Sequence, residues 1–183
     1  MRRFLSISFI TALAAVAVCS LFLGVGFVHA ANATPAAAQA TTRSMYVTFY
    51  GWPDNSPPGN AIAYPVKHSG AGGKGTFSDP ITYATDKAEL AIGTIVYVPY
   101  VQRYVIMEDD CVQCDSDWSH GHKAHIDLWV GGKGAPSSAV INCEDALTQN
   151  GNVSVIVHPA SNLKVSSIPL FNSSTRACYH PGS

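Results

Sequence analysis

From Met45 onward, short apolar runs alternate with clusters of Gly, Pro, Asn and Asp. The runs are rich in Val, Ile, Tyr and Thr, which suit a pleated and half-buried surface, and the clusters favour turns. We therefore predict six strands, over residues 46–50, 81–84, 94–98, 103–108, 125–130 and 153–158. Six short strands with little helix predict a compact all-β barrel or sandwich.

Only two short stretches have a helical pattern. Asp86 is followed three residues later by Glu89, as in a capping box at the start of a helical turn. Residues 144–149 are a second candidate turn, which the Asn-Gly pair after them would end. The glycine-rich residues 70–75 match a dinucleotide-binding fingerprint formally. Neither a strand precedes them nor a helix follows, so we predict a flexible loop.

The first 30 residues are basic at the start, apolar in the middle and small at the end. This pattern is typical of a secretory signal peptide, and an uncleaved membrane anchor is the alternative. Residues 31–43 are small and have nothing to bury, so we predict a flexible leader. The predicted organisation is a signal peptide over residues 1–30, this leader, and one domain over residues 44–183. We expect a secreted, extracellular protein without membrane contact after signal removal.

Charge narrows the classes of partner. Removal of the signal would leave nine Lys and Arg residues against twelve Asp and Glu residues, a formal charge of −3. No basic surface would then be left to hold a phosphate backbone, which excludes nucleic acid. We expect a monomer that needs no cofactor.

Four cysteines lie in the predicted domain: Cys111, Cys114, Cys143 and Cys178. An even number in an exported chain predicts two disulfides, and the three possible pairings stay open. A bond between Cys111 and Cys143 would close a loop and stabilise a small barrel by about 3–4 kcal/mol. The Cys-x-x-Cys pair with His120, His122 and His125 also contains enough ligands for zinc. Exported cysteines usually oxidise, so we predict no metal site.

The segment over residues 103–129 carries most of the candidate chemistry. It contains half of the acidic residues of the chain, namely Glu108, Asp109, Asp110, Asp115, Asp117 and Asp127. A predicted strand leads into a loop that begins with two cysteines, and a second strand leads out of it. This arrangement predicts that carboxylates gather at one rim of a barrel.

Two motifs in this segment resemble the signature of the double-psi β-barrel superfamily. Residues 106–114, Ile-Met-Glu-Asp-Asp-Cys-Val-Gln-Cys, are similar to its strand ending in Asp-x-Cys-x-x-Cys, and residues 125–128, His-Ile-Asp-Leu, to its next short strand. Residues 48–51, Thr-Phe-Tyr-Gly, resemble the opening of expansins, and residues 93–98 resemble a central Gly-x-x-Val-x-Val strand. The superfamily includes expansins, related endoglucanases, barwin-like proteins, rare lipoprotein A and a secreted papain inhibitor of actinomycetes. The resemblance spans roughly residues 46–130 and implies a six-stranded double-psi β-barrel with short helical turns.

The resemblance also implies roles for two aspartates. Asp127 corresponds to the His-Phe-Asp-Leu aspartate of expansins and endoglucanases, a general acid or a carboxylate that orients a glycan. Protonating a glycosidic oxygen needs a carboxyl with a raised pKa, which a partly buried strand can supply. Alternatively, Asp127 accepts backbone N–H groups and has a structural role. Asp109 lies where related lytic transglycosylases keep a catalytic aspartate, and those enzymes need one carboxylate because the substrate's own hydroxyl attacks.

The chain departs from the superfamily pattern in three places. Residues 61–65 occupy the region of the usual Ala-Cys-Gly element, and residues 115–124 form an insert between the two motifs. The Thr-Arg-Tyr-Trp-Asp motif, which supplies the second catalytic carboxylate in the endoglucanases, has no clear counterpart. Asp54 is the nearest candidate for that carboxylate.

Aromatic residues near these carboxylates are candidates for sugar contact, because flat rings suit the apolar faces of sugars. We predict that Tyr50, Trp52, Trp118 and His125 form the substrate-binding surface, as aromatic residues do in the groove of expansin-like barrels. Trp118 lies in a polar stretch and is predicted to be an exposed platform. Trp129 lies on a predicted strand and is expected in the core.

Three functional hypotheses follow. The first is an expansin-like barrel that binds or loosens a cell-wall polysaccharide, such as cellulose, chitin or peptidoglycan, without hydrolysis. The second is a glycan-cleaving enzyme of lytic transglycosylase or endoglucanase type that uses Asp127 or Asp109. The third is a secreted inhibitor of a cysteine protease.

Overall fold

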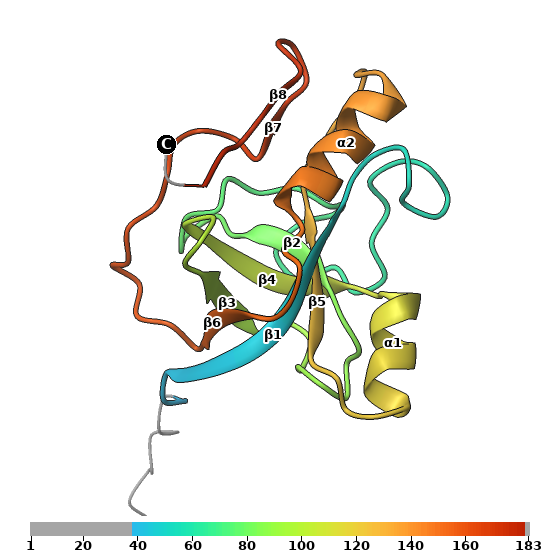
Figure 1. Cartoon of the computed structure of the whole chain (residues 1–183). Coiled ribbons are helices and arrows are strands. Elements are labelled where there is room, and N and C mark those ends of the chain that lie inside the picture. The colour runs from blue at the N-terminus through green and yellow to red at the C-terminus, as the bar shows by residue number, and fades with distance from the viewer. Residues whose placement is uncertain (1–37, 182–183) are drawn as a thin grey trace, which may run out of the picture. The chain divides into compact units, whose positions relative to one another are not determined.

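The computed structural model describes residues 38–181, and they form a closed β-barrel with two short helices outside it (Figure 1). The predicted signal peptide and the first seven residues of the predicted leader lie outside the described residues. The barrel strands are β1 (Thr41–Tyr50), β2 (Ile81–Ala84), β3 (Ile95–Val98), β4 (Arg103–Asp109), β5 (His125–Trp129) and β6 (Val153–Val157). The prediction of an all-β fold with a six-stranded barrel is confirmed.

The strands close the barrel in the order β1-β5-β2-β4-β3-β6. Two neighbouring pairs are parallel, β1 with β5 and β2 with β4, and the other pairs are antiparallel. The ten residues of β1 serve two partners, because its first half pairs with β6 and its second half with β5. Each barrel strand therefore has two partner strands, and the closed sheet has no terminal strand whose edge would invite aggregation.

The core lies inside the barrel and beneath the helices. In β1, Met45, Val47 and Phe49 are buried while the residues between them are not, which is the period of two expected for a strand. All seven residues of β4 are buried, because the barrel interior lies on one face and covering segments lie on the other. Burial of these apolar side chains is the main stabilising contribution to the fold.

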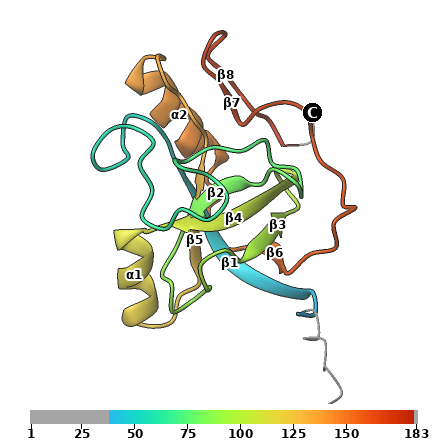
Figure 2. The same ribbon diagram turned by 180° about the vertical axis from the view of Figure 1, so that it is seen from behind.

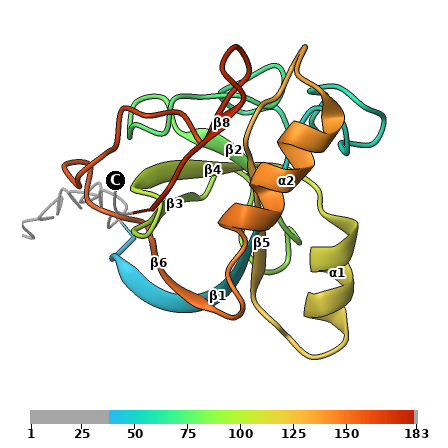
Figure 3. The same cartoon turned by 45° about the horizontal axis from the view of Figure 1, so that its top comes forward.

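Helix α1 (Val112–Ser119) packs against β5, and α2 (Ser137–Leu147) packs against β1. Both helices lie on the same side of the barrel (Figure 3). The long segment between β1 and β2 also runs over the outside of the barrel on that side, as the view from behind shows (Figure 2). No helix among residues 38–181 is long and apolar enough to span a bilayer.

The predicted strands agree with the observed ones, apart from their ends. The largest difference is at β1, which begins at Thr41 inside the predicted flexible leader. Residues 41–45 pair with β6 through their backbones, while several of their side chains stay exposed. The strand prediction rested on which side chains could be buried. It therefore missed residues 41–45, which contribute to the barrel through backbone hydrogen bonds.

The helices differ more from the prediction. Helix α1 occupies a stretch that was predicted as a polar loop, and α2 begins at Ser137 rather than at residue 144. The side chain of Cys111 caps α1 by accepting the N–H of Cys114. Both helices are short and show only part of an amphipathic pattern, which is why the sequence did not reveal their full extent. Packing against the barrel, rather than helix propensity, stabilises them. Near Asp86 the chain forms the predicted turn, which Asp86 caps by accepting the N–H of Ala88 at 2.6 Å. The reciprocal bond of a capping box is not formed, because the Glu89 carboxyl bonds Arg43 and the N–H of His125 instead.

The two disulfides join Cys111 to Cys114 and Cys143 to Cys178. The considered bond between Cys111 and Cys143 is therefore wrong. The first disulfide closes the N-terminal turn of α1. The second ties α2 to the hairpin of β7 (Phe171–Asn172) and β8 (Ala177–Cys178), which follows the last barrel strand.

The two disulfides are expected to contribute unequally to stability. Replacing both Cys143 and Cys178, which are 35 residues apart, by alanine should lower the free energy of unfolding by about 3–4 kcal/mol. The same change at Cys111 and Cys114, three residues apart, should cost only about 2 kcal/mol, because the closed loop is short. Urea unfolding followed by fluorescence measures both losses. Equal losses would contradict the loop-closure argument.

Candidate functional site

An acidic cleft of about 560 Å³ opens at one rim of the barrel. Its wall combines residues of β1, β2, β4 and β5 with the segment after β1 and the first turn of α1. Four carboxylates and a tyrosine line it: Asp54, Asp109, Asp110, Asp127 and Tyr50. The structure thus brings together both predicted catalytic residues, Asp127 and Asp109, and one predicted binding residue, Tyr50.

Strand order sets the spacing of the two predicted catalytic residues. Asp127 on β5 and Asp109 on β4 both have Ala84 of β2 as their cross-strand partner. They are therefore two strand spacings apart, about 10 Å between backbones. Because the side chain of Ala84 is small, the space between the two carboxylates stays open to the cleft.

Asp127 is half-buried, and one neighbour partly satisfies its carboxyl. Parallel pairing of β1 with β5 puts Thr48 directly opposite Asp127, with Thr48 Oγ1 2.7 Å from Asp127 Oδ1. Burial raises the pKa of Asp127 to about 7, the hydrogen bond from Thr48 opposes this shift, and the charges of Asp54 and Asp109 add to it. Near neutral pH this carboxyl can therefore either hold or release a proton, as a general acid must.

Both oxygens of Asp109 already have partners. Its Oδ2 accepts a hydrogen bond from the Tyr50 hydroxyl at 2.9 Å, and its Oδ1 accepts the N–H of Ala63 at 2.9 Å. This carboxylate therefore holds in place both Tyr50 and the segment between β1 and β2 that contains Ala63. Burial, followed by the charge of Asp109, raises the pKa of Tyr50 well above its usual value, so the phenol keeps its proton.

Glu144 of α2 is a functional candidate that the sequence analysis missed. It is buried, and its Oε1 has no hydrogen-bond partner among the described residues. Burial first, and then the charge and hydrogen bond of Asp54, raise the pKa of Glu144 to about 8. Gly51 permits this approach, since a Cβ there would lie 2.6 Å from Glu144 Oε1. Asp54 in turn accepts the N–H of Gly51 at 2.8 Å. A glutamate on a half-amphipathic helix gives no sequence signal of this role.

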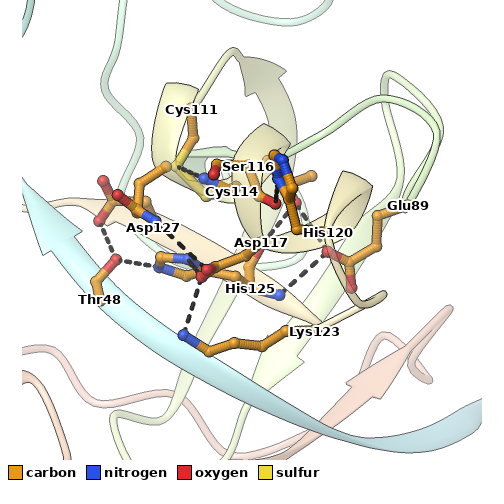
Figure 4. A network of polar contacts seen from close by, with 12 residues as sticks. Thr48, Glu89, Cys111, Cys114, Ser116, Asp117, His120, Lys123, His125 and Asp127 are labelled. Atoms are coloured by element: carbon orange, nitrogen blue, oxygen red, sulfur yellow. Dashed lines mark hydrogen bonds and ion pairs between the residues drawn. A yellow bond between two sulfur atoms is a disulfide. The ribbon is translucent and has the colours of Figure 1, made fainter.

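His125 extends the site away from the cleft. Its Nε2 lies 2.9 Å from Thr48 Oγ1, and its Nδ1 lies 2.8 Å from Asp117 Oδ2 on α1 (Figure 4). Lys123 Nζ pairs with the same Asp117 oxygen at 2.9 Å. His125 is only 3% exposed and does not line the cleft, so the predicted direct contact with substrate is not formed there. Any influence of His125 on a ligand in the cleft would be indirect, through Thr48.

The predicted aromatic platform is not assembled at the cleft. Trp118 is half-buried on α1 with its ring against His122, and Trp52 packs on the core with Lys133 over its ring. Neither ring lines the cleft. Trp129 is buried beside Tyr50, as expected for a core residue.

Glu108, the first acid of the predicted cluster, has a structural role. It is fully buried and accepts hydrogen bonds from the backbone N–H groups of Lys67 and His68 and from the Thr82 hydroxyl. His68 Nδ1 lies 2.6 Å from its second oxygen, and His68 Nε2 lies 3.1 Å from Asp79. Burial alone would raise the pKa of Glu108, but these hydrogen bonds lower it overall, so the carboxylate stays charged and holds residues 66–68, just before the glycine-rich loop.

The cysteines and one histidine lie close enough for a metal site in geometric terms. The two sulfurs of Cys111 and Cys114 and a ring nitrogen of His125 all lie within 4.8 Å of one another. The sulfurs are bonded to each other, so they are not thiolate ligands. The other two histidines considered for zinc, His120 and His122, are exposed.

Comparison with known proteins places the chain in a family. The family described as "DDB_G0273701 N-terminal domain" matches residues 42–179. The chain belongs to this family. A relative from Dictyostelium discoideum, called "Uncharacterized protein DDB_G0273701/DDB_G0273221", is 44% identical over 135 residues, which is 72% of this chain and 58% of the relative. The chain thus spans a little over half the length of that relative. No solved structure matches.

The residues matched to the family include the cleft, the network around His125 and both disulfides. The acidic site therefore lies wholly within the family domain. Nothing in the names of the family or of the relative describes an activity, so the function has to be argued from the site.

Glu144→Gln is expected to stabilise the protein more as pH rises. The folded pKa of about 8 exceeds the usual 4.5, so the folded state holds this proton more tightly and wild type loses stability as pH rises between those values. Glutamine can donate to Asp54 without that proton. The gain should be near zero at about pH 4 and roughly 1–4 kcal/mol at about pH 9.

Urea unfolding across this pH range measures the difference between Glu144→Gln and wild type. Asp145→Asn, at the exposed next position of α2, is the matched control. It removes only the weakest of the charges that raise the pKa of Glu144, so its gain should change with pH far less. A gain from Glu144→Gln that does not change with pH would contradict the raised pKa.

Proposed function

We propose that this protein acts on a polysaccharide in the acidic cleft, with Asp127 as the general acid that protonates a glycosidic oxygen. One observation carries the proposal. The Asp127 carboxyl lines an open cleft, is half-buried, and has a pKa raised to about 7 by burial and by the charges of Asp54 and Asp109. A carboxyl that keeps its proton at every pH below about 7 and faces a ligand-sized cleft suits acid catalysis.

We also propose that the barrel is of the double-psi type and that the protein is exported to act on a cell-wall polymer. The two parallel pairs, β1 with β5 and β2 with β4, support the first part, together with the motifs at residues 106–114 and 125–128. The basic, apolar and small-residue pattern of residues 1–30 and the two disulfides support the second part.

The surroundings of the other carboxylates favour a mechanism with a single acid. Both oxygens of Asp109 already accept hydrogen bonds, from Tyr50 and Ala63, so it is not available as a base. Asp54 accepts the N–H of Gly51 through Oδ1 and lies on the segment after β1. In the proposed step Asp127 gives its proton to the glycosidic oxygen while the bond from that oxygen to the anomeric carbon breaks. A hydroxyl of the same sugar then bonds to the anomeric carbon and returns its proton to Asp127. The product carries an internal anhydro ring rather than a reducing end.

Asp127→Asn is expected to abolish soluble glycan products, because asparagine cannot deliver the proton. Wild-type protein comprising residues 31–183 would be incubated with cellulose, chitin and peptidoglycan, and mass spectrometry would identify released fragments and their ends. A loss of at least about 100-fold is expected for removal of a general acid.

Asp145→Asn is the matched control for this loss, since it removes an exposed carboxylate outside the cleft. Anhydro ends would support the single-acid step, and reducing ends would instead require a water-activating base. Wild-type fragments that persist in Asp127→Asn would overturn the assignment of Asp127.

Expansin-like binding without cleavage is the second candidate, favoured by the hydrogen bonds that already engage both oxygens of Asp109, the other predicted catalytic residue. It predicts retention on insoluble polymer without soluble products.

Ala61→Trp, which adds a large ring to an exposed residue of the cleft wall, should weaken retention. Trp118→Ala, outside the cleft, should leave it unchanged, and the reverse result would move the binding surface to α1. Protease inhibition stays a prediction from the resemblance.

A further inference from the structure

His125 lies between two polar groups that make opposite demands on its ring. On one side is Asp117 Oδ2, 2.8 Å from Nδ1, and on the other is Thr48 Oγ1, 2.9 Å from Nε2. Thr48 Oγ1 is in turn 2.7 Å from Asp127 Oδ1, so a continuous line of hydrogen bonds joins α1 to the cleft carboxyl (Figure 4).

Asp117 determines which ring nitrogen holds a proton permanently. Burial acts to raise the pKa of Asp117, but hydrogen bonds from Lys123 and His125 outweigh it and lower the pKa overall. An ionised carboxylate only accepts hydrogen bonds, so Nδ1 of His125 must carry hydrogen in both charge states of the ring. Only Nε2, the nitrogen that faces Thr48, changes when the ring titrates.

The Thr48 hydroxyl then has one proton for two neighbours. When His125 is charged, Nε2–H donates to Thr48, which donates to Asp127 Oδ1, so a proton on Asp127 must reside on Oδ2. When His125 is neutral, Thr48 donates its hydrogen bond to Nε2, so a protonated Asp127 must carry its proton on Oδ1 and donate a hydrogen bond from there to Thr48. Oδ2 has no hydrogen-bond partner among the described residues, and Asp127 lines the cleft, so Oδ2 is the oxygen available to a ligand.

We propose that the charge of His125 decides, through the Thr48 hydroxyl, which oxygen of Asp127 carries the acidic proton. With His125 charged, the proton is on Oδ2 and can pass to a glycan in the cleft. With His125 neutral, the proton is held on Oδ1 against Thr48 and Asp127 is inactive as an acid. This inference rests on the proposed function for its consequence in catalysis, but the proton arrangement itself does not.

Other charged and titratable groups surround the two residues. His125 is faced by Asp117 of α1, by Lys123, by the ring of Tyr46 on β1, and by Glu89, which accepts its backbone N–H. Asp127 is faced by Tyr50 on β1, Asp54, Asp109 on β4 and Glu144 on α2. The negative charge around Asp127 favours the proton there, and burial lowers the pKa of His125.

The consequence for pH dependence has a definite sign. Burial lowers the pKa of His125 below its usual value, whereas the pKa of Asp127 is raised to about 7. As pH rises, His125 loses its proton first, and Asp127 turns its proton away from the cleft while it is still protonated. Acid catalysis should therefore fall at a lower pH than the titration of Asp127 itself.

Infrared spectroscopy with isotope-labelled aspartate tests the arrangement without any substrate. The Asp127 band is assigned by subtracting the spectrum of Asp127→Asn. When pH rises through the titration of His125, the protonated C=O band should move to higher frequency, because Oδ1 then stops accepting a hydrogen bond as a carbonyl. In Thr48→Val this shift should vanish, whereas Thr94→Val, which alters a buried threonine with no side-chain partner in the hydrogen bonds of the described residues, should preserve it. A band that does not move in wild type overturns the proposal.

Nitrogen-15 NMR of the His125 ring gives a second readout. Neutral His125 should carry its hydrogen on Nδ1, and an Nε2–H ring at neutral pH would overturn the proposal. Asp117→Asn should lower the pKa of His125 by about one unit, and Lys123→Met should raise it, because these variants remove charges of opposite sign. Shifts in the same direction would contradict the assigned roles.

The same variants separate this inference from the proposed function. If glycan cleavage occurs, the pH at which it falls should move down in Asp117→Asn and up in Lys123→Met. Both movements should disappear in a Thr48→Val background, since a purely structural effect or a field through space would survive there. If no glycan is cleaved but the infrared shift and the ring proton are as expected, only the proposed function fails. If cleavage occurs without that infrared shift, only this inference fails.

Discussion

The parallel pairing of β1 with β5 is the constraint on which the site depends. This register places Thr48 beside Asp127 and Tyr50 beside Trp129 at the rim of the barrel. A slip by one residue would turn each of these side chains to the opposite face of the sheet. Closure of the barrel through β6 and packing of α2 on β1 prevent such a slip. The chemistry of the cleft is thus a consequence of backbone hydrogen bonding between two strands whose paired residues, such as Thr48 and Asp127, are 79 positions apart.

The fold tolerates a concentration of negative charge in a small volume. Asp54, Asp109 and Asp127 line the cleft, and the buried Glu144 interacts with Asp54 and Asp127. Two of these groups have a raised pKa, about 7 for Asp127 and about 8 for Glu144. Burial is the largest cause for both. Carboxyl groups whose pKa values are raised by burial and by neighbouring negative charges, and which lie at or near a cleft, are typical of a functional site rather than of a structural one. Glu108 shows the contrast, because hydrogen bonds from the backbone and from His68 satisfy its charge fully.

The sequence patterns located part of this site. Asp127, Asp109 and Tyr50 were singled out by motif, and the structure gathers them in one cleft. The sequence analysis did not identify Glu144, because its role depends on the approach of α2 to Gly51, which no local sequence pattern indicates. Trp118 was expected to be an exposed platform, yet the polar stretch around it folds into α1, which half-buries its ring outside the cleft.

The amino-acid sequence by itself determined the six strands, because runs of β-branched and aromatic residues between turn formers act locally. It also determined that four cysteines would pair, since their number and context suffice, although three pairings remained open. Tertiary structure alone decided which cysteines meet, that β1 extends back to Thr41, and that Asp117 and His125 reach Asp127 through Thr48. These outcomes depend on which distant strands pair and in what order. The local sequence around a residue contains no information about that order, because it is set by contacts between segments far apart in the chain.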